Sequence, residues 1–358
     1  MRIEQLTFTR FLAAVSIVFF HFAKGSFIFH NPYLDFLVKY SSVFVSYFFI
    51  LSGFVMIVAY HTKSEINIIE YGRNRFARIY PLYFAGIVMM AIVPILKNEI
   101  NFLDLFLNIF MIQSWIPQKA LTLNVPGWSI SVEAFFYILF PFLFNVVYKR
   151  ISLKTISISI IVFWIISQIV YQFMVLRPIE NFPFSPHDLL YFPLLHLNEF
   201  LIGNLAGIYF VHNFQNNKRN FDLAILGVLI LLIIALKFPT RLEYNNGMLA
   251  VLFVPLIVLL SLNTGIITTL FKSKICVFLG EISFGIYLLQ NPVWVWVSDY
   301  RLKKYFNLDE AEHYTMAFLI RFVVLLVLAA IFYKFFEVPV GNKIKKTSLV
   351  PFFSKERI

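Results

Sequence analysis

Four ionisable side chains, Arg10, His21, Glu133 and Glu199, lie within strongly apolar stretches of this sequence. Arg10 and His21 share one apolar run near the N-terminus, and Glu133 lies in another, within V-P-G-W-S-I-S-V-E. A neutral histidine is the commonest general base for activating a hydroxyl group, and a carboxylate can hold its tautomer and stabilise the imidazolium. Ionisable side chains at membrane depth are costly, so these residues predict a functional site in which His21 is suited to be a base and Glu133 its partner.

The basic residues near these positions suit a phosphorylated ligand. Arg10 and His21 are eleven residues apart on one predicted helix, so they face nearly the same direction about 16 Å apart along its axis. Arg73, Arg75 and Arg78 follow in R-N-R-F-A-R-I-Y-P, and guanidinium groups match phosphate geometry. Two simpler readings remain open: Arg10 can extend to the headgroups while His21 marks the interface, and the three later arginines can anchor a cytoplasmic loop.

A second histidine and carboxylate occur together further along the chain. His196 and Glu199 are three residues apart, so they can share one face of a helix. We interpret them as a satisfied polar pair, with a catalytic role as the alternative. No H-E-x-x-H or comparable ligand spacing occurs in the sequence, and no metal site is predicted.

The elements that position these residues are membrane-spanning helices. Hydrophobic residues make up 60% of the 358 residues and charged residues only 14%, whereas a soluble chain has about half and a quarter. Spans need about 20 apolar residues each. The sequence therefore predicts an all-α polytopic membrane bundle of about ten transmembrane helices, near residues 6–23, 43–61, 79–97, 128–148, 155–175, 190–211, 221–238, 247–263, 276–297 and 315–336.

One further apolar run, 102–116, is short and contains Asp104 and Asn108, which predicts a re-entrant or interfacial helix. Leaving it out of the spans puts more Lys and Arg on the inner loops than on the outer ones, in agreement with the positive-inside rule. Both termini are then cytoplasmic, and Glu133 lies at the same outer depth as His21. The net charge of +11 is interpreted as this topology signal rather than as a nucleic-acid surface.

Seven motifs in order make the chain resemble the acyltransferase 3 family of bacterial membrane acyltransferases. Arginine and histidine in the first helix match Arg10 and His21, and F-F-I-L-S-G-F follows at 48–54. The later matches are Arg75 and Arg78 before I-Y-P, W-S-I-S-V-E with F-Y and a proline at 128–141, E-F-L-I-G at 199–203, S-F-G-I-Y-L at 283–288, and E-V-P at 337–339. Where many relatives have a histidine after S-F/Y-x-x-Y-L, this chain has Gln290 and Asn291.

The resemblance implies an O-acyltransferase in the bacterial cytoplasmic membrane. Such an enzyme moves an acyl group, commonly acetyl, from cytoplasmic acyl-CoA to a hydroxyl of an O-antigen, an exopolysaccharide or a lipid-linked sugar. On this reading His21 and Glu133 are catalytic, and the CoA phosphates bind the arginines Arg10, Arg73, Arg75 and Arg78. The substrate pocket comprises Trp128, Ser129, Ser131, Tyr287, Gln290 and Asn291. We expect one transmembrane domain, 1–340, a basic cytoplasmic tail, 341–358, and no permanently bound cofactor.

Two other classes of function fit part of the pattern. A transporter or flippase for a lipid-linked sugar also has buried charges and aromatic walls, but it has no need of a histidine and carboxylate beside a basic donor site. A structural subunit leaves the face shared by Arg10 and His21 unexplained. The acceptor sugar, the acylated position and the acyl length are open at this stage. The oligomeric state is open as well, since lipid-facing helix surfaces and dimer surfaces have similar compositions in membranes.

Overall fold

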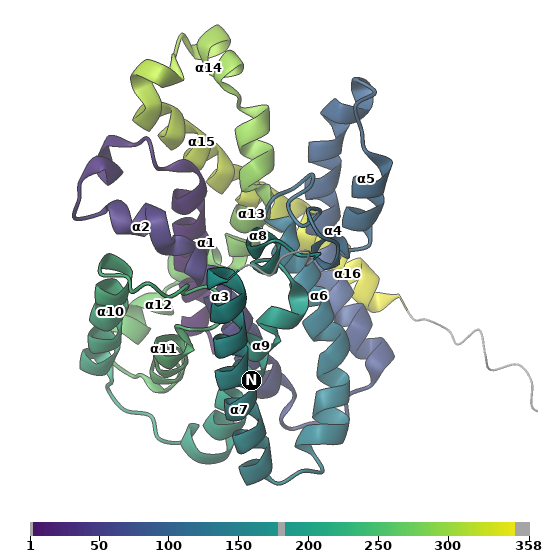
Figure 1. Ribbon diagram of the computed structural model, residues 1–358, viewed down its shortest axis with the longest axis vertical. Coiled ribbons are helices and arrows are strands. Elements are labelled where there is room, and N and C mark those ends of the chain that lie inside the picture. The colour runs from purple at the N-terminus through teal and green to yellow at the C-terminus, as the bar shows by residue number, and fades with distance from the viewer. Residues whose placement is uncertain (1–2, 178–182, 348–358) are drawn as a thin grey trace, which may run out of the picture.

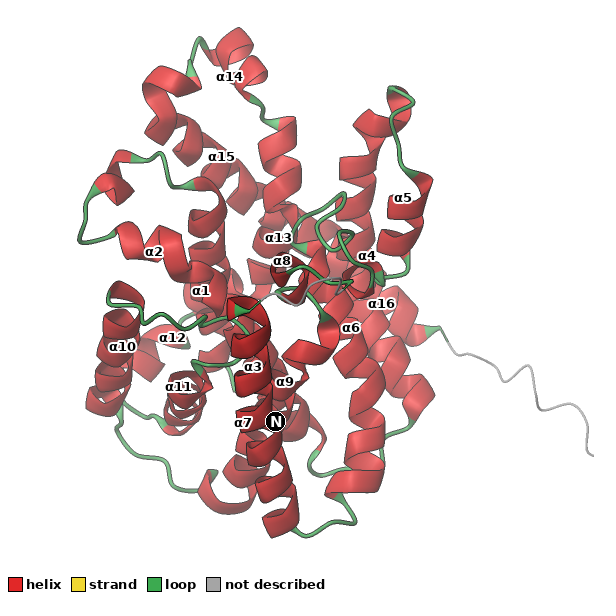
Figure 2. Ribbon diagram, viewed as in Figure 1, coloured by secondary structure: helices red, strands yellow, loops and turns green. Residues whose placement is uncertain are grey.

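The structure is a computed structural model, and it describes residues 3–177 and 183–347. These residues form an all-helical bundle (Figures 1 and 2). A helix satisfies its backbone hydrogen bonds internally, as an apolar solvent requires. The helices are α1 Gln5–Phe22, α2 Asp35–Tyr40, α3 Phe44–Tyr60, α4 Ile68–Leu96, α5 Phe102–Ile109, α6 Gly127–Phe142, α7 Leu153–Leu176, α8 Pro186–Leu189, α9 Leu197–Tyr209, α10 Asp222–Lys237, α11 Ala250–Leu262, α12 Ile266–Phe271, α13 Lys274–Trp296, α14 Asp299–Phe306, α15 Glu310–Phe332 and α16 Val338–Lys346.

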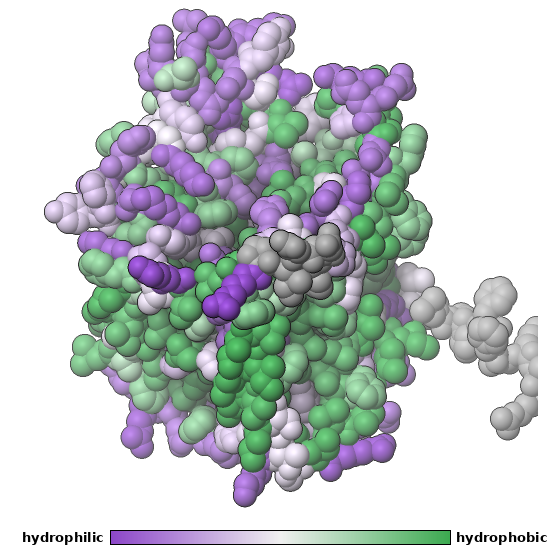
Figure 3. Space-filling model, viewed as in Figure 1, coloured by the Kyte–Doolittle hydropathy of each residue, from purple (hydrophilic) through white to green (hydrophobic). Residues whose placement is uncertain are grey.

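Three of these helices continue into π-helical segments. They are Leu143–Tyr148 after α6, Phe210–Phe214 after α9, and Tyr333–Glu337, which joins α15 to α16. With such extensions, eight helices among the described residues are long and apolar enough to cross a membrane. Figure 3 shows apolar side chains over most of the middle of the visible face and polar ones gathered at the two ends. The predicted membrane bundle is therefore confirmed.

Two of the ten predicted spans are shorter than the others. The helices at these positions, α10 and α11, have 16 and 13 residues. At 1.5 Å per residue they extend about 24 and 20 Å, less than the roughly 30 Å of a hydrocarbon core. The run at 102–116 forms only the eight-residue α5 and a 3₁₀ turn, which confirms that it does not form a spanning helix.

The predicted boundary between domain and tail falls within a helix. Residue 341 lies inside α16, which packs along α4. Residues 348–358 of the predicted tail lie outside the described residues.

Helices α1 and α13 run side by side in the same direction. The backbone of Gly280 in α13 lies so close to α1 that an added Cβ would be 2.1 Å from the Thr7 carbonyl oxygen. Fourteen residues later, Trp294 stacks on Phe22 with ring centroids 4.1 Å apart. Residues at a given depth in α1 therefore lie beside residues at the same depth in α13, so depths along the two helices can be compared. We call the start of α1 the predicted inner end of the bundle and its finish the predicted outer end.

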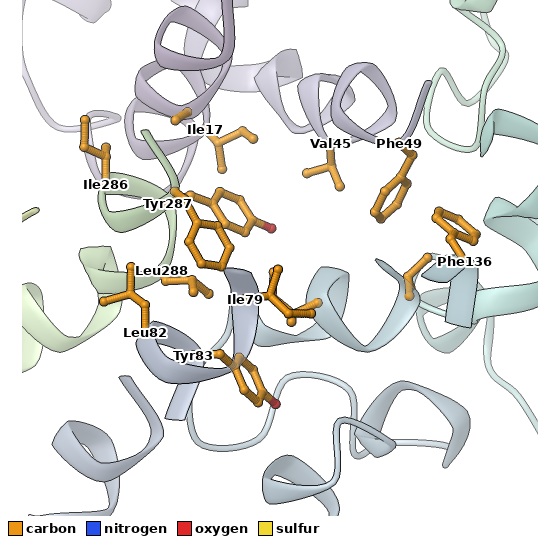
Figure 4. Close-up of a cluster of buried hydrophobic side chains, with 14 of the residues drawn as sticks. Ile17, Val45, Phe49, Ile79, Leu82, Tyr83, Phe136, Ile286, Tyr287 and Leu288 are labelled. Carbon is orange, nitrogen blue, oxygen red and sulfur yellow. The ribbon is translucent and has the colours of Figure 1, made fainter. Parts of the chain in front are cut away.

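A second close contact brings α3 against α9. An added Cβ on Gly203 would lie 2.1 Å from the Ile50 carbonyl oxygen, and one on Gly53 would lie 2.2 Å from the Phe200 carbonyl oxygen. Small residues allow such approach in membrane bundles. Figure 4 shows part of the apolar core that α1, α3, α4, α6 and α13 share, including Ile17, Val45, Phe49, Ile79 and Tyr287. This core surrounds the cavity described next.

Candidate active site

A cavity of about 430 Å³ lies between α1, α3, α4, α6 and α13 toward the predicted inner end. Six of the residues that the sequence predicted for the site line it: Arg10, Arg75, Arg78, Ser129, Glu133 and Tyr287. Motifs that are far apart in the sequence thus meet around one space.

The wall formed by α6 is a stripe of polar side chains one turn apart. Ser129, Glu133 and Tyr137 recur every four residues and all line the cavity. The Glu133 carboxylate accepts hydrogen bonds from the Tyr137 hydroxyl and, at 3.4 Å, from the Ser52 hydroxyl of α3. The charged neighbours of Arg10 include Glu133. Glu133 is therefore held inside a cavity that three arginines and a second carboxylate, Glu281, also line.

The three arginines of α4 have different surroundings. Arg75 lies over the rings of Tyr71 and Tyr137, 5.8 and 5.6 Å from their centroids, and contacts the Met56 sulfur at 3.6 Å. Arg78 pairs with Glu337 at 2.7 Å. These two side chains line the cavity, with Arg75 free of any carboxylate partner among the described residues.

Arg73 does not lie in the cavity, although it was assigned to the donor site from the sequence. Its Nη1 donates to the Thr347 carbonyl oxygen at 2.9 Å, just beyond the last residue of α16. It is not among the residues that line the cavity. A cation near helix carbonyls is favourable because of the helix dipole. Arg73 thus holds the end of α16 in this structure.

Ser129 and Tyr287 meet at the outer part of the cavity. Their hydroxyls are 2.8 Å apart, and Ser129 also donates to the Pro126 carbonyl oxygen at 3.0 Å. Both side chains are buried, and the apolar residues Ile17 and Val45 belong to the same core as Tyr287 (Figure 4). A hydroxyl pair therefore lies at the outer part of the cavity, next to the apolar core.

The predicted contact between His21 and Glu133 is not formed. His21 is exposed near the end of α1, does not line the cavity, and makes no hydrogen bond within the described part of the chain. Trp294 stacks on Phe22, which directly follows His21, and Tyr287 precedes Trp294 by seven residues. Tyr287 and its partner Ser129 therefore lie about 10 Å inward of Phe22. Glu133, one turn inward from Ser129, therefore lies near the level of Arg10, about three helical turns from His21.

The prediction of equal depth was wrong because α6 begins inside the bundle. The segment before it is anchored at mid-helix positions: Tyr83 donates to the Asn108 carbonyl oxygen at 2.7 Å, and Asn124 donates to the Leu288 carbonyl oxygen at 3.0 Å. Gln113 donates to Tyr83 at 3.1 Å and to the Gly127 carbonyl oxygen at 2.9 Å. These buried amides bring the start of α6 down to the level of Tyr287.

The remaining predicted pocket residues lie around the cavity without lining it. Trp128 makes ring contacts with Phe49, Tyr191 and His196. Ser131 is buried, and its hydroxyl has no partner among the described residues. Gln290 is fully buried and donates to the Tyr287 carbonyl oxygen at 2.7 Å, while Asn291 is half-buried.

The pairing of His196 with Glu199 is confirmed. His196 Nδ1 lies 2.7 Å from the Glu199 carboxylate, its Nε2 lies 2.9 Å from the Leu190 carbonyl oxygen, and both side chains are buried. The pair borders Trp128 and lies outside the cavity. Among the described residues, no group of three or more His, Cys, Asp or Glu side chains is arranged to hold a metal ion.

Two cavity residues, Ser52 and Tyr137, and one residue that contacts a cavity arginine, Glu337, were not assigned a role from the sequence. Ser52 and Tyr137 hold Glu133, and Glu337 holds Arg78. The four-residue spacing from Glu133 to Tyr137 was visible in the sequence and could have identified Tyr137. Ser52 and Glu337 had no such signal, because their partners are 81 and 259 residues away.

The sequence of residues 3–334 matches a family described as an acyltransferase domain. The chain is also 31% identical over 160 residues to acyltransferase MdmB of Streptomyces mycarofaciens, covering 42% of this chain and 41% of that protein. It is 24% identical over 328 residues to O-acetyltransferase OatA of Staphylococcus aureus strain NCTC 8325 / PS 47, covering 84% and 52%.

A third relative is the putative acetyltransferase ORF330 of Acidianus two-tailed virus, 25% identical over 250 residues, which covers 68% of this chain and 70% of that protein. The alignments to MdmB and OatA thus span about half the length of those two relatives. No solved structure matches the chain.

Proposed function

The chain belongs to the acyltransferase domain family, and we propose that it transfers an acyl group, acetyl in the simplest case, from acyl-CoA to a hydroxyl of a cell-surface or lipid-linked carbohydrate. Names of relatives as acyltransferases and acetyltransferases support the reaction class. The observation that carries the proposal is the arrangement along α1: Arg10 lines a cavity together with Arg75 and Arg78, and His21 lies about 16 Å further out on the same helix. We place the protein in the bacterial cytoplasmic membrane with both termini cytoplasmic.

The donor would bind in the cavity with its phosphates at the inner end. Arg75 offers guanidinium hydrogen bonds without a competing carboxylate among the described residues, and Arg10 makes no hydrogen bond or ion pair with them. Planar guanidinium groups match phosphate oxygens. An extended pantetheine arm has a length of the order of the separation between Arg10 and His21, so it can carry the thioester outward.

His21 is the proposed general base. It would accept the proton of the acceptor hydroxyl as that oxygen attacks the thioester carbonyl carbon. The new C–O bond forms, the C–S bond breaks, and the proton passes to the departing thiolate, which leaves free CoA. In this proposal Glu133 no longer orients His21. Its carboxylate instead balances the charge of Arg10 beside the donor arm.

In this proposal a path must open from the cavity to the level of His21. Val45, Ser129 and Tyr287 line the cavity, and Ile17, between Arg10 and His21 on α1, belongs to the same apolar core as Val45 and Tyr287. The hydroxyl pair is suited to this, because each group can exchange its bond to the other for a bond to an amide of the donor arm at little cost.

The reaction is tested on the glycans of the producing cell. Mass spectrometry compares cells that contain wild-type protein, His21→Ala and, as a matched control, His30→Ala at equal membrane abundance. His30 is also exposed, in the loop after α1. Acylation is expected with the wild type and His30→Ala and lost with His21→Ala. Full acylation with His21→Ala removes the proposed base. Absence of acylation in every strain, with a change in the amount of exported sugar, favours the transporter.

The donor site is tested by acetyl-CoA binding to purified protein. Arg75→Ala is expected to weaken binding by roughly tenfold or more, as for loss of one charged hydrogen bond. Arg150→Ala is the control, because Arg150 is exposed at the same predicted end of the bundle. Equal affinity of Arg75→Ala and wild type contradicts the placement of the phosphates.

A further inference from the structure

Helix α16, yellow in Figure 1, packs against α4, and its contacts fall on the part of α4 that carries the arginines. Three contacts join them. Glu337, directly before α16, pairs with Arg78 at 2.7 Å, and an added Cβ on Gly341 would lie 2.9 Å from the Ala77 carbonyl oxygen. Beyond the last residue of α16, the Thr347 carbonyl oxygen accepts from Arg73 at 2.9 Å.

These contacts occupy two of the three arginines of α4. The Arg78 side chain is 34% exposed and lines the cavity, so it is accessible to a ligand. Glu337 is only 3% exposed, and its second carboxylate oxygen has no hydrogen-bond partner among the described residues. A carboxylate held in this way against a cavity arginine occupies the position of an anionic ligand group.

We propose that α16 and Glu337 compete with the donor for these arginines, so that the Arg78–Glu337 ion pair and a donor phosphate at Arg78 exclude each other. Glu337 is then a residue that sets donor affinity. The inference rests on the proposed function for the identity of the donor, and the competing ligand is a phosphate or pyrophosphate group in chemical terms.

The backbone before α16 provides a route for the exchange. Glu337 is the last residue of the π-helical segment Tyr333–Glu337, and such segments are common at functional sites. Conversion of a π-helical turn to α-helix shifts the following residues by one position, about 100° around the axis at 3.6 residues per turn. A turn of this size moves the carboxylate away from Arg78 without unfolding α16.

The test measures binding of two probes, acetyl-CoA and inorganic pyrophosphate, to the purified full-length protein by calorimetry. Glu337→Gln removes the competing charge and keeps the side-chain shape. It is expected to bind both probes roughly tenfold more tightly than wild type, the order expected for one charged contact that is partly exposed to solvent.

Two further variants complete the design. Gly341→Ala leaves every charge in place but moves α16 away from Ala77, so it is expected to tighten binding in the same direction. Glu310→Gln is the matched control, because Glu310 also pairs with an arginine, Arg321 at 2.8 Å, and does not line the cavity. Its affinity is expected to equal that of wild type.

Each outcome decides the inference. Equal or weaker binding by Glu337→Gln overturns it, and weaker binding makes Glu337 a positioning residue for Arg78. If Glu337→Gln fails to fold, Gly341→Ala decides by the same criterion. Tighter pyrophosphate binding without any acetyl-CoA binding supports the competition and contradicts the proposed donor. Acetyl-CoA binding and transfer that are unchanged in both variants leave the proposed function in place and refute the competition.

Discussion

Replacing Gly280 with alanine tests whether the close contact between α1 and α13 sets the geometry of the cavity. The added Cβ would lie 2.1 Å from the Thr7 carbonyl oxygen and 2.4 Å from the carbonyl carbon. Non-bonded contacts of this kind relax to about 3.5 Å, so the two helices must separate locally by about 1.4 Å. Arg10 lies one turn beyond Thr7, and Tyr287 lies two turns beyond Gly280, so both would move.

Stability and activity are both expected to fall. Overpacking costs about 1–3 kcal/mol, while the gain in helix propensity from glycine to alanine returns about 0.5–1 kcal/mol, so we expect a net loss of about 1–2 kcal/mol. A displacement of about 1 Å in a reacting geometry can cost on the order of 100-fold in rate, which is the loss expected for acyl transfer.

The assays are thermal unfolding in detergent and acyl transfer per folded molecule. Gly227→Ala is the matched control, because no atom lies within 4 Å of an added Cβ at that position in α10. It is expected to be slightly more stable than wild type and fully active. A Gly280→Ala protein that unfolds at or above the wild-type temperature and transfers at the wild-type rate refutes the reasoning.

Three further predictions concern single side chains. Tyr287→Phe leaves Ser129 with its backbone partner, so we expect a loss of only about 1 kcal/mol in thermal unfolding. Glu199→Ala leaves the buried His196 ring without its carboxylate partner, and a loss of about 1–3 kcal/mol is expected by the same measurement. Burial alone would raise the pKa of Asp188, but hydrogen bonds from two backbone N–H groups and a serine hydroxyl hold that pKa below its ordinary value of 3.8. Its stabilisation is thus present above about pH 4 and lost as the pH falls through the lowered pKa; unfolding temperatures of wild type and Asp188→Asn that do not converge in acid contradict this assignment.

Sequence reasoning located the helices and six of the residues that line the cavity, since both depend on local patterns. Apolar runs identify helices because the bilayer leaves the backbone no other partners. Arg10 and Glu133 stood out because a charge within an apolar run is costly without a purpose. Arg75 stood out because guanidinium groups match phosphate geometry. Each of these arguments uses only residues that lie within about one helix length of each other in the sequence.

The depth of Glu133 could not be obtained in this way. A run of apolar residues gives the length of a spanning helix. It does not give the depth in the membrane at which that helix begins after a re-entrant segment. That level is set by Gln113 and Asn124, whose hydrogen bonds reach the middle of other helices. From the sequence, Asp104 and Asn108 indicated only that the short run does not span the membrane, and Gln113 and Asn124 gave no signal of the contacts that place α6.

The charges of the cavity show a similar limit with a functional consequence. From sequence, Arg75 and Arg78 are equivalent neighbours of one motif, three residues apart. In the structure, Arg75 is held by aromatic rings, while Arg78 is paired with a carboxylate from the other end of the chain. A ligand phosphate can therefore reach Arg75 first and must displace Glu337 to reach Arg78. The difference predicts that Arg75→Ala weakens donor binding more than Arg78→Ala, whereas equivalent arginines would lose equally.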